Sequence, residues 1–234
     1  MKIEHLLSES QETKTLFRGM GLRSPAPPGT IIDIPVRQDR KPLTASVLAA
    51  MLFDYGIERA FGVKNIRRRG LFCSTDRDQA QDYADAAKGQ RAVVELMPEP
   101  NTPVIYHPHQ DDSYNVMSGD FVWDAAACVR DLMIKYKHPE VEFNSKQQLL
   151  TTARNNFYVG DYLKMDPLDL WVREIELIVN GGDSKDVNHA INLFTTMADA
   201  MVQGYQQTTY GGFPGGRFIE TILYDIQSVK GKIL

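Results

Sequence analysis

The chain has 234 residues, of which 43% are hydrophobic and 24% are charged, and its formal net charge at pH 7 is -4. This length allows one large domain or two small ones, and we favour a single domain over residues 1–234. The negative net charge disfavours a general nucleic-acid binder, although a local basic patch remains at Arg67, Arg68 and Arg69. Cys73 and Cys128 form neither a disulfide framework nor a close-spaced metal set, which suits a reducing compartment.

Residues 1–13 form a short polar lead-in that lacks the apolar core of a signal peptide. No segment approaches the roughly 20 apolar residues of a membrane-spanning helix. We therefore expect a soluble protein of the cytoplasm, acting in its own cell or in a host cell, with no signal peptide and no membrane contact.

The first part of the chain predicts short strands and helices in succession. A brief strand at 15–20 is stopped by glycine, and a second extended piece covers 31–36. A helix opens near 42–44 and ends near Gly56, as judged from apolar residues at helical spacing. Residues 70–73 are extended, a helix starts at 74–76, and a strand follows at 90–97.

Residues 105–165 read as a helical insertion. A helix is expected over 122–136, and Ser145 with Gln148 forms a capping box that opens another helix. His107 and His109 flank a proline, lie in no regular element and lack a third ligand at recognisable spacing, so we assign no metal site.

The segment 169–179 is predicted as a buried strand that carries two carboxylates. Successive strand side chains point to opposite faces, so Glu174 and Glu176 share one face while the apolar residues between and after them share the other. We expect the apolar face to meet the core and the carboxylates to face a cleft. A solvated face or cross-strand ion pairs would explain the same pattern without catalysis.

A helix over 188–203 and a strand over 217–226 are expected in a C-terminal extension at about 185–234. The glycine-rich segment 211–216 between them reads as a loop and not as a phosphate cradle, because no helix follows it. Strands and helices mix irregularly along the chain, which favours an α+β fold over a doubly wound α/β sheet.

Two upstream segments place polar residues at strand ends. Arg18 precedes Gly19, where its side chain would reach a cleft beside approachable backbone, although a surface arginine is the plainer interpretation. Ser74 and Thr75 stand at a strand-to-helix junction, where hydroxyls commonly cap the helix. Neither segment identifies an activity by itself.

Together, the three segments resemble the mono-ADP-ribosyltransferases of the class, with toxin-like and phage-like members, that carries an Arg, a Ser-Thr-Ser motif and a Glu-x-Glu motif in that order. Phe17-Arg18-Gly19 is similar to the family's aromatic-Arg-Gly at the end of its first core strand. Residues 72–76 are similar to the aromatic-x-Ser-Thr-Ser segment, and residues 174–179 to the Glu-x-Glu strand. Asp76 departs from the pattern, because it replaces the last serine.

The resemblance implies an α+β core of two packed mixed β-sheets around an NAD cleft, flanked by helices. It also implies an enzyme that uses NAD as co-substrate, needs no metal and releases nicotinamide. Glu176 would stabilise the oxocarbenium-like state and bind the ribose, and Arg18 would hold the NAD phosphates. Gly19 would offer its backbone to the nicotinamide amide, Ser74 would position Glu176, and Thr75 would shape the strand end.

For the acceptor, the resemblance implies a target protein that carries an arginine. An acceptor arginine needs a carboxylate to orient it and to take its proton, and Glu174 would supply that carboxylate. Trp171 would lie beside the loop that receives the target.

Three alternatives remain. The chain would be a non-catalytic structural or interaction module if it keeps the fold without turnover, or an NAD glycohydrolase if the same site transfers to water. A nucleic-acid-directed transferase has only the arginines at 67–69 in its favour, and a solvated basic turn explains these better.

Overall fold

The computed structural model describes residues 14–22, 24–41, 46–87, 89–109, 119–138, 141, 145–216 and 219–234. The chain divides into two compact units. The sheet unit comprises 1–37, 70–112 and 204–234, and the helical unit comprises 38–69 and 113–203. The helical unit differs from the expected insertion at 105–165, because it starts at 113, continues to 203 and also includes 38–69.

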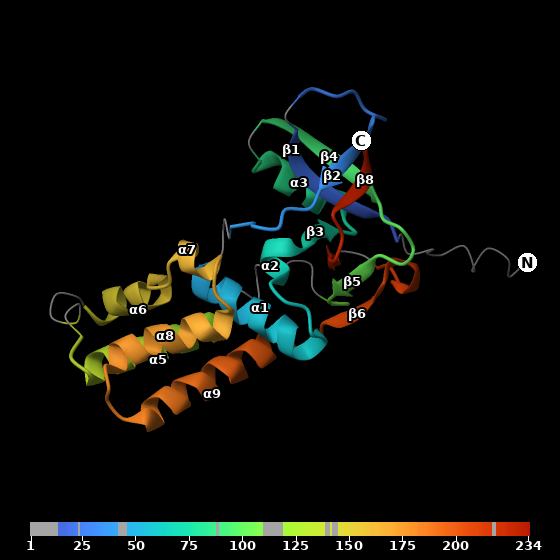
Figure 1. The fold of residues 1–234 in the computed structure, drawn as a ribbon. Coiled ribbons are helices and arrows are strands. Elements are labelled where there is room, and N and C mark those ends of the chain that lie inside the picture. Colours follow the sequence, from blue (N-terminus) through green and yellow to red (C-terminus); the bar gives the residue numbers. More distant parts are fainter. Residues whose placement is uncertain are drawn as a thin grey trace, which may run out of the picture. The chain divides into compact units, whose positions relative to one another are not determined.

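The sheet unit is built on eight strands in the order β2-β8-β4-β1-β3-β7-β5-β6 (Figure 1). The strands are β1 Leu16–Leu22, β2 Ile31–Pro35, β3 Leu71–Ser74, β4 Gln90–Met97, β5 Pro103–Tyr106, β6 Gln206–Thr209, β7 Glu220–Leu223 and β8 Ser228–Ile233. All pairings between these described strands are antiparallel. The α+β class is confirmed, but the expectation of two mixed sheets is wrong, since these strands form one antiparallel sheet.

Alternation along the strands gives the sheet an apolar core face. Leu16, Val94 and Leu223 belong to the buried cluster on this face. Helix α3 (Arg77–Asp85) packs against β1 and β4, where its buried alanines Ala80 and Ala84 form a second cluster.

Helix α3 makes its closest approach to β1 at Gly19. A Cβ atom on Gly19 would lie 1.9 Å from Ala80 O and 2.3 Å from Ala84 N. Both atoms belong to the helix backbone, so no side-chain rotation would relieve the overlap. The glycine at the midpoint of β1 is therefore required by helix packing.

The pairing between β1 and β3 is the shortest in the sheet. β1 pairs with β4 along its whole length but with β3 at one position, where Phe17 faces Ser74. β3 pairs with β7 over all four residues. On the side turned toward β3, residues 18–22 of β1 therefore have no strand partner among the described residues, and we call this side the unpaired β1 edge.

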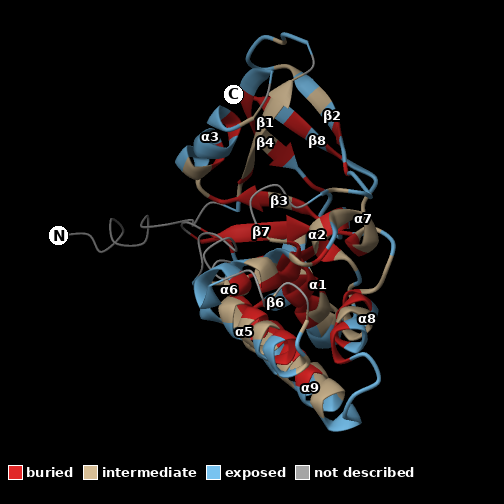
Figure 2. Ribbon diagram, turned by 90° about the vertical axis from the view of Figure 1, so that its left-hand side faces the viewer, coloured by how far each residue is buried: buried red, intermediate tan, exposed pale blue. Residues whose placement is uncertain are grey.

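The helical unit is built around α1, most of which is buried (Figure 2). The helices are α1 Val47–Phe61, α2 Ile66–Arg69, α5 Asp120–Lys135, α6 Lys146–Asn155, α7 Val159–Tyr162, α8 Pro167–Val179 and α9 Ser184–Met201. Ser46 caps the start of α1, and Gly62 ends it in the left-handed conformation. Gly56, the expected end, lies inside α1 where the helix crosses α9, because a Cβ there would be 2.4 Å from Ala198 O.

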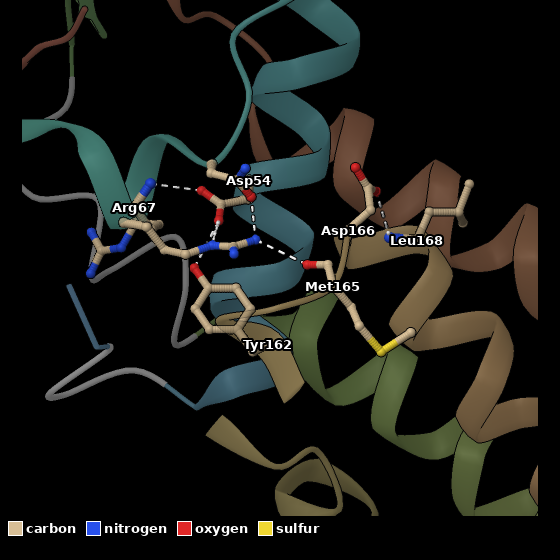
Figure 3. Close-up of polar contacts among 8 residues, drawn as sticks. Asp54, Arg67, Tyr162, Met165, Asp166 and Leu168 are labelled. Carbon is tan, nitrogen blue, oxygen red and sulfur yellow. Dashed lines mark hydrogen bonds and ion pairs between the residues drawn. The ribbon is translucent and has the colours of Figure 1, made fainter. Parts of the chain in front are cut away.

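A buried polar cluster joins α1, α2 and α7 (Figure 3). Asp54 is fully buried and accepts hydrogen bonds from Arg67 N and from Tyr162 Oη, each at 2.7 Å. The Arg68 guanidinium lies 4.7 Å from the Tyr162 ring centre, and its Nε lies 3.9 Å from Asp54 Oδ2. Burial raises the pKa of Asp54 to about 6, against the opposing effect of these donors and arginines.

Because Arg68 belongs to this cluster and is only 6% exposed, the basic patch expected at 67–69 loses its middle residue. The sequence-based case for a nucleic-acid substrate rested on that patch. The case is therefore weaker than the run of three arginines indicated.

Several other elements predicted from the sequence are present in the structure. The strands at 15–20, 31–36 and 90–97 correspond to β1, β2 and β4, and the helix at 122–136 to α5. The capping box of Ser145 and Gln148 opens α6 as predicted. β5, β6 and β8 were not predicted. The lead-in at 1–13, the helix start at 42–44 and residues 217–218 lie outside the described residues. None of the described helices is long and apolar enough to cross a membrane.

Candidate functional site

The end of β3 brings Ser74, Thr75 and Asp76 to the junction with α3. Asp76 is the N-cap of the helix, because its Oδ1 accepts a hydrogen bond from Gln79 N at 2.7 Å. Ser74 does not cap the helix; its Oγ accepts a hydrogen bond from Asp76 N at 2.9 Å. A hydroxyl that accepts this bond keeps its own O–H proton for another acceptor.

Thr75 extends the pairing of β3 with β7 by one residue. Its backbone N donates to Ile219 O at 3.0 Å, and its Oγ1 accepts from Ile219 N at 2.8 Å. The side-chain hydroxyl thus takes the place of a backbone carbonyl in the ladder. The start of β7 is fixed by this buried threonine.

Glu220 stands directly opposite Ser74 in the β3–β7 ladder, and Ser74 stands opposite Phe17 on β1. Residues in register share a face of the sheet, so Ser74 and Glu220 lie on the side of Phe17 and α3. Glu220 is 8% exposed. Buried carboxylates are rare, because they cost free energy unless partners or function retain them.

Arg18 is the neighbour of Phe17 but leaves β1 on the opposite face. Its Nη1 donates a hydrogen bond to Phe72 O, so the guanidinium bridges β1 and β3 beside their one paired position. Burial lowers the pKa of Arg18, with Cys73 acting in the opposite direction, and an arginine stays protonated under such a shift.

Cys73 on β3 is a buried thiol whose pKa is affected by the charges of Arg18 and Glu220. Burial raises the pKa of Cys73, Arg18 lowers it, and Glu220 raises it. Its Sγ donates a hydrogen bond to Thr221 O at 3.1 Å. The two charges therefore reach the same residue, although Arg18 and Glu220 lie on different faces of their strands.

The predicted strand at 169–179 is wrong, because residues Pro167–Val179 form helix α8. Asp166 caps the helix start, Pro167 occupies its first turn, and Asn180 ends it in the left-handed conformation. Residues two apart on an α-helix point about 200° apart, so Glu174 and Glu176 do not share a face.

Glu174 and Glu176 have unlike surroundings on α8. Glu174 accepts hydrogen bonds from Arg173 Nε at 3.1 Å and Nη2 at 2.6 Å, and Arg173 also pairs with Asp161. Glu176 is exposed. The shared-face geometry on which both assignments depended is absent from this helix.

Trp171 is fully buried in the helical unit. Its ring stacks on Phe157 and Phe194 at centre-to-centre distances of 5.7 and 4.7 Å, and its Nε1 donates to Ala190 O at 3.1 Å. A side chain enclosed in this way packs the helices and is not accessible to an acceptor protein. The predicted role of Trp171 in acceptor recognition is therefore incompatible with its surroundings.

Of the predicted site residues, the sheet unit brings together Arg18, Gly19, Ser74 and Thr75 on β1 and at the end of β3. The residues Trp171, Glu174 and Glu176 belong to the helical unit. Glu220 is the carboxylate that the sequence motifs missed. Its signal was a single acidic residue beside Ile219 in a strand that is otherwise apolar or hydroxylic and entirely buried.

Among the residues that the structure describes, no three or more His, Cys, Asp or Glu side chains are grouped to hold a metal ion. Comparison of the chain with protein-family models, curated proteins and solved structures gave no match.

Proposed function

We propose that the protein is an NAD-dependent ADP-ribosyltransferase whose catalytic carboxylate is Glu220, in place of Glu176. The observation that supports this most is the register of three neighbouring strands, in which Phe17, Ser74 and Glu220 stand in one row. The order Arg, Ser, Glu along the chain is then preserved. On this proposal, the sheet unit is the part of the protein that binds NAD.

The reaction breaks the bond between the ribose C1′ and the nicotinamide nitrogen, and nicotinamide leaves with the bonding electron pair. Positive charge develops on the ribose in an oxocarbenium-like transition state. A carboxylate fixed beside this charge stabilises the transition state more than the ground state. We assign this role to Glu220, which stands opposite Ser74 on a strand inside the sheet.

The donors around β1 and β3 fit NAD as a co-substrate. The Arg18 guanidinium has five N–H donors, of which Nη1 serves Phe72 O, and its fork suits phosphate oxygens. The unpaired β1 edge offers backbone groups to the nicotinamide amide. Because Arg18 and Glu220 leave their strands on opposite faces, NAD has to lie along this edge to reach both.

Transfer to water is the second candidate function, because the sequence around Glu220 favours it. The residue two positions before Glu220 is Phe218, so the Glu-x-Glu pair linked to arginine acceptors is missing there. A site with one carboxylate can still stabilise the oxocarbenium ion, and water would then capture C1′ with loss of a proton.

The test uses NAD labelled in its adenylate part, incubated with the protein and a cell lysate. Glu220→Gln keeps the side-chain size and removes the charge, and Glu176→Gln makes the same change at an exposed position of helix α8. We expect Glu220→Gln to lose NAD turnover by about 100-fold or more, and Glu176→Gln to retain it, with both variants folded in a melting experiment. A labelled protein band indicates transfer, and free ADP-ribose alone indicates hydrolysis.

Full turnover by Glu220→Gln, or loss of turnover in Glu176→Gln, would overturn the assignment of the carboxylate. A wild-type protein that consumes no NAD under either condition would instead favour a non-catalytic module.

A further inference from the structure

We propose that Asp54 is a proton-operated latch, which holds α2 and α7 on α1 while its carboxyl group is neutral and releases them locally when that group is ionised. The latch lies in the helical unit and does not rest on the proposed function. Its parts come from three segments of the chain: Asp54 belongs to α1, Arg67 and Arg68 to α2, and Tyr162 to α7.

One carboxylate attaches both short helices to α1. Its Oδ1 accepts a hydrogen bond from Arg67 N and its Oδ2 accepts one from Tyr162 Oη, each at 2.7 Å (Figure 3). Arg68 joins the two helices to each other, because its Nη2 donates to Met165 O at 3.1 Å and its guanidinium lies over the Tyr162 ring. Helices α2 and α7 have four residues each, too few for a helix that is stable alone. Their position therefore depends on tertiary contacts, of which this cluster supplies the polar ones.

The ionised form of Asp54 is a buried charge that no cation of the cluster hydrogen-bonds. Arg68 Nε lies 3.9 Å from Asp54 Oδ2, beyond hydrogen-bond distance, and has no hydrogen-bond partner among the described residues. Arg68 Nη2 is engaged by Asn65 Oδ1 and Met165 O. A buried charge costs free energy unless it is paired and hydrogen-bonded. The closed cluster therefore favours the neutral carboxyl group.

The neutral form of Asp54 keeps both attachments. A proton on Oδ2 is donated to Tyr162 Oη across the same 2.7 Å, because a phenol hydroxyl both donates and accepts, and Oδ1 remains an acceptor for Arg67 N. Burial and Asp54 raise the pKa of Tyr162, so the tyrosine hydroxyl keeps its own proton. The change of charge thus alters the cost of closing the latch without altering its contacts.

Groups on α2 and α7 act on the charge of Asp54. Burial raises the pKa of Asp54 to about 6, while Arg67, Arg68 and Tyr162 oppose this shift. On the other helices packed against α1, the following charged residues have partners of their own: Asp199 of α9 pairs with Arg59, Asp166 at the start of α8 lies 3.6 Å from Lys64, and Arg154 of α6 lies over the Trp123 ring of α5. The proton affinity of Asp54 therefore reflects its enclosure by α1, α2 and α7.

The direction of the pH effect follows from the proton affinities of the two states. The closed latch binds the Asp54 proton more tightly than the open, hydrated latch, in which the carboxyl group has its ordinary pKa near 4. The closed state is therefore favoured most below about pH 4, and it loses this advantage as pH rises to about 6. The equilibrium between the closed and open states changes by about 100-fold over this range.

Opening of the latch concerns a small part of the helical unit. The packing of α1 on α9, where Gly56 approaches Ala198 O, does not involve the latch residues. Helix α2 ends at Arg69, after which the chain passes to the sheet unit, and Arg68 O accepts a hydrogen bond from Arg40 N at 3.2 Å. Opening therefore loosens two connections of the helical unit, at residues 38–40 and at Arg69, and leaves the helix bundle in place.

The test is hydrogen exchange of backbone amides in the whole protein, measured by NMR from pH 4 to pH 8 as protection relative to an unstructured peptide at the same pH. The Arg67 amide reports on the latch because it donates to Asp54, and the amide of buried Phe194 in α9 reports on the bundle. We expect the protection of Arg67 to fall by about 100-fold between pH 4 and pH 7 and then to stay level, with Phe194 better protected throughout. The chemical shift of the Asp54 carboxyl carbon should titrate with a midpoint at about 6.

Two variants separate Asp54 from other carboxylates. Asp54→Asn keeps an acceptor for Arg67 N and offers an N–H to Tyr162 Oη, so it resembles the neutral form. Its Arg67 amide should be equally protected at pH 4 and pH 7. Asp166→Asn removes a carboxylate beside the cluster and keeps a good N-cap for α8, so Arg67 should exchange with the same pH dependence as in wild type.

Equal protection of Arg67 and Phe194 at every pH would show that Arg67 exchanges only by global unfolding, which overturns the proposal. A pH-dependent Arg67 amide in Asp54→Asn would assign the effect to another group and overturns it as well. A wild-type carboxyl midpoint near 4 overturns the proposal without any variant, so the test holds even where Asp54→Asn does not fold.

Discussion

Ser74 on β3 lies directly opposite Glu220 on β7, and its hydroxyl accepts a hydrogen bond from Asp76 N at 2.9 Å. Because this bond occupies an oxygen lone pair, the Ser74 O–H proton remains for a carboxylate on the same face. Two polar residues that are 146 positions apart in the sequence thus lie opposite each other in the β3–β7 ladder. The contacts of Thr75 and Gly19, which hold the neighbouring strands and helix α3 in place, can be tested directly.

Thr75→Val is expected to loosen the start of β7. The change keeps the side-chain shape and removes the Oγ1 that accepts from Ile219 N, which leaves that buried N–H without its acceptor. The free energy of unfolding should fall by about 1–3 kcal/mol, the usual cost of an unsatisfied buried donor. NAD turnover should fall further than stability accounts for, since Glu220 is the next residue. Urea denaturation and a turnover assay on the same preparation measure the two effects.

Thr75→Ser is the control, since it keeps the hydroxyl and loses only a methyl group. It should remain close to wild type in both measurements. If the valine and serine variants behave alike, the bond to Ile219 N does not position β7 and the effect is one of packing alone.

Gly19→Ala is expected to push α3 away from β1. The new Cβ would meet the backbone at Ala80 O and Ala84 N, 1.9 and 2.3 Å away, so the helix itself must move. Overpacking of this kind costs about 1–3 kcal/mol or more of the free energy of unfolding, measurable as a lower melting temperature. Gly160→Ala is the matched change, because its nearest contact is the ring of Tyr158, which is 72% exposed and free to turn away. Equal stability of the two variants would contradict the close packing of α3.

In the sheet unit, the sequence correctly predicted strands whose local signals agree with the tertiary structure, but it did not predict how those strands pair. Arg18 and Ser74 were placed on separate strand ends, and β1 and β3 are strands in the structure. Their pairing through Phe17 is a contact between residues 57 positions apart, and nothing in either segment specifies it. Glu220 was missed for the same reason, because what distinguishes it is its position opposite Ser74 and not a motif.

The error at 169–179 came from favouring the two-residue alternation of Glu174 and Glu176 over helix signals in the same segment. Asp166 followed by Pro167 is a helix start, and the buried residues of α8 recur at helical spacing. Leu177, which the strand pattern placed in the core, is 64% exposed. The period of a short apolar run does not decide between helix and strand, and the capping residues should have decided it.

The raised pKa of Asp54 predicts that the free energy of unfolding decreases as pH rises, which is opposite to the usual effect of a carboxylate. Its pKa is raised from 3.8 to about 6 in the folded protein, chiefly by burial, so between these values the folded state binds more protons than the unfolded state. The free energy of unfolding therefore decreases as pH rises from about 4 through 6, and this group adds no further dependence above that range. A pKa shift of this size lowers the free energy of unfolding by on the order of 3 kcal/mol across this pH range.

Asp54→Asn removes the titration, and the measurement is urea unfolding at steps from pH 4 to pH 8 for wild type and variant. The difference between the free energies of unfolding of wild type and variant should change by about 3 kcal/mol across pH 4 to 6 and then stay level. The other carboxylates contribute equally to both curves. Asp199→Asn is the control for removing a carboxylate at an exposed position, where Asp199 pairs with Arg59 at 2.8 Å. Parallel curves for Asp54→Asn would mean that Asp54 keeps an ordinary pKa, and that Arg67 N, Tyr162 and Arg68 together offset the cost of burying its charge.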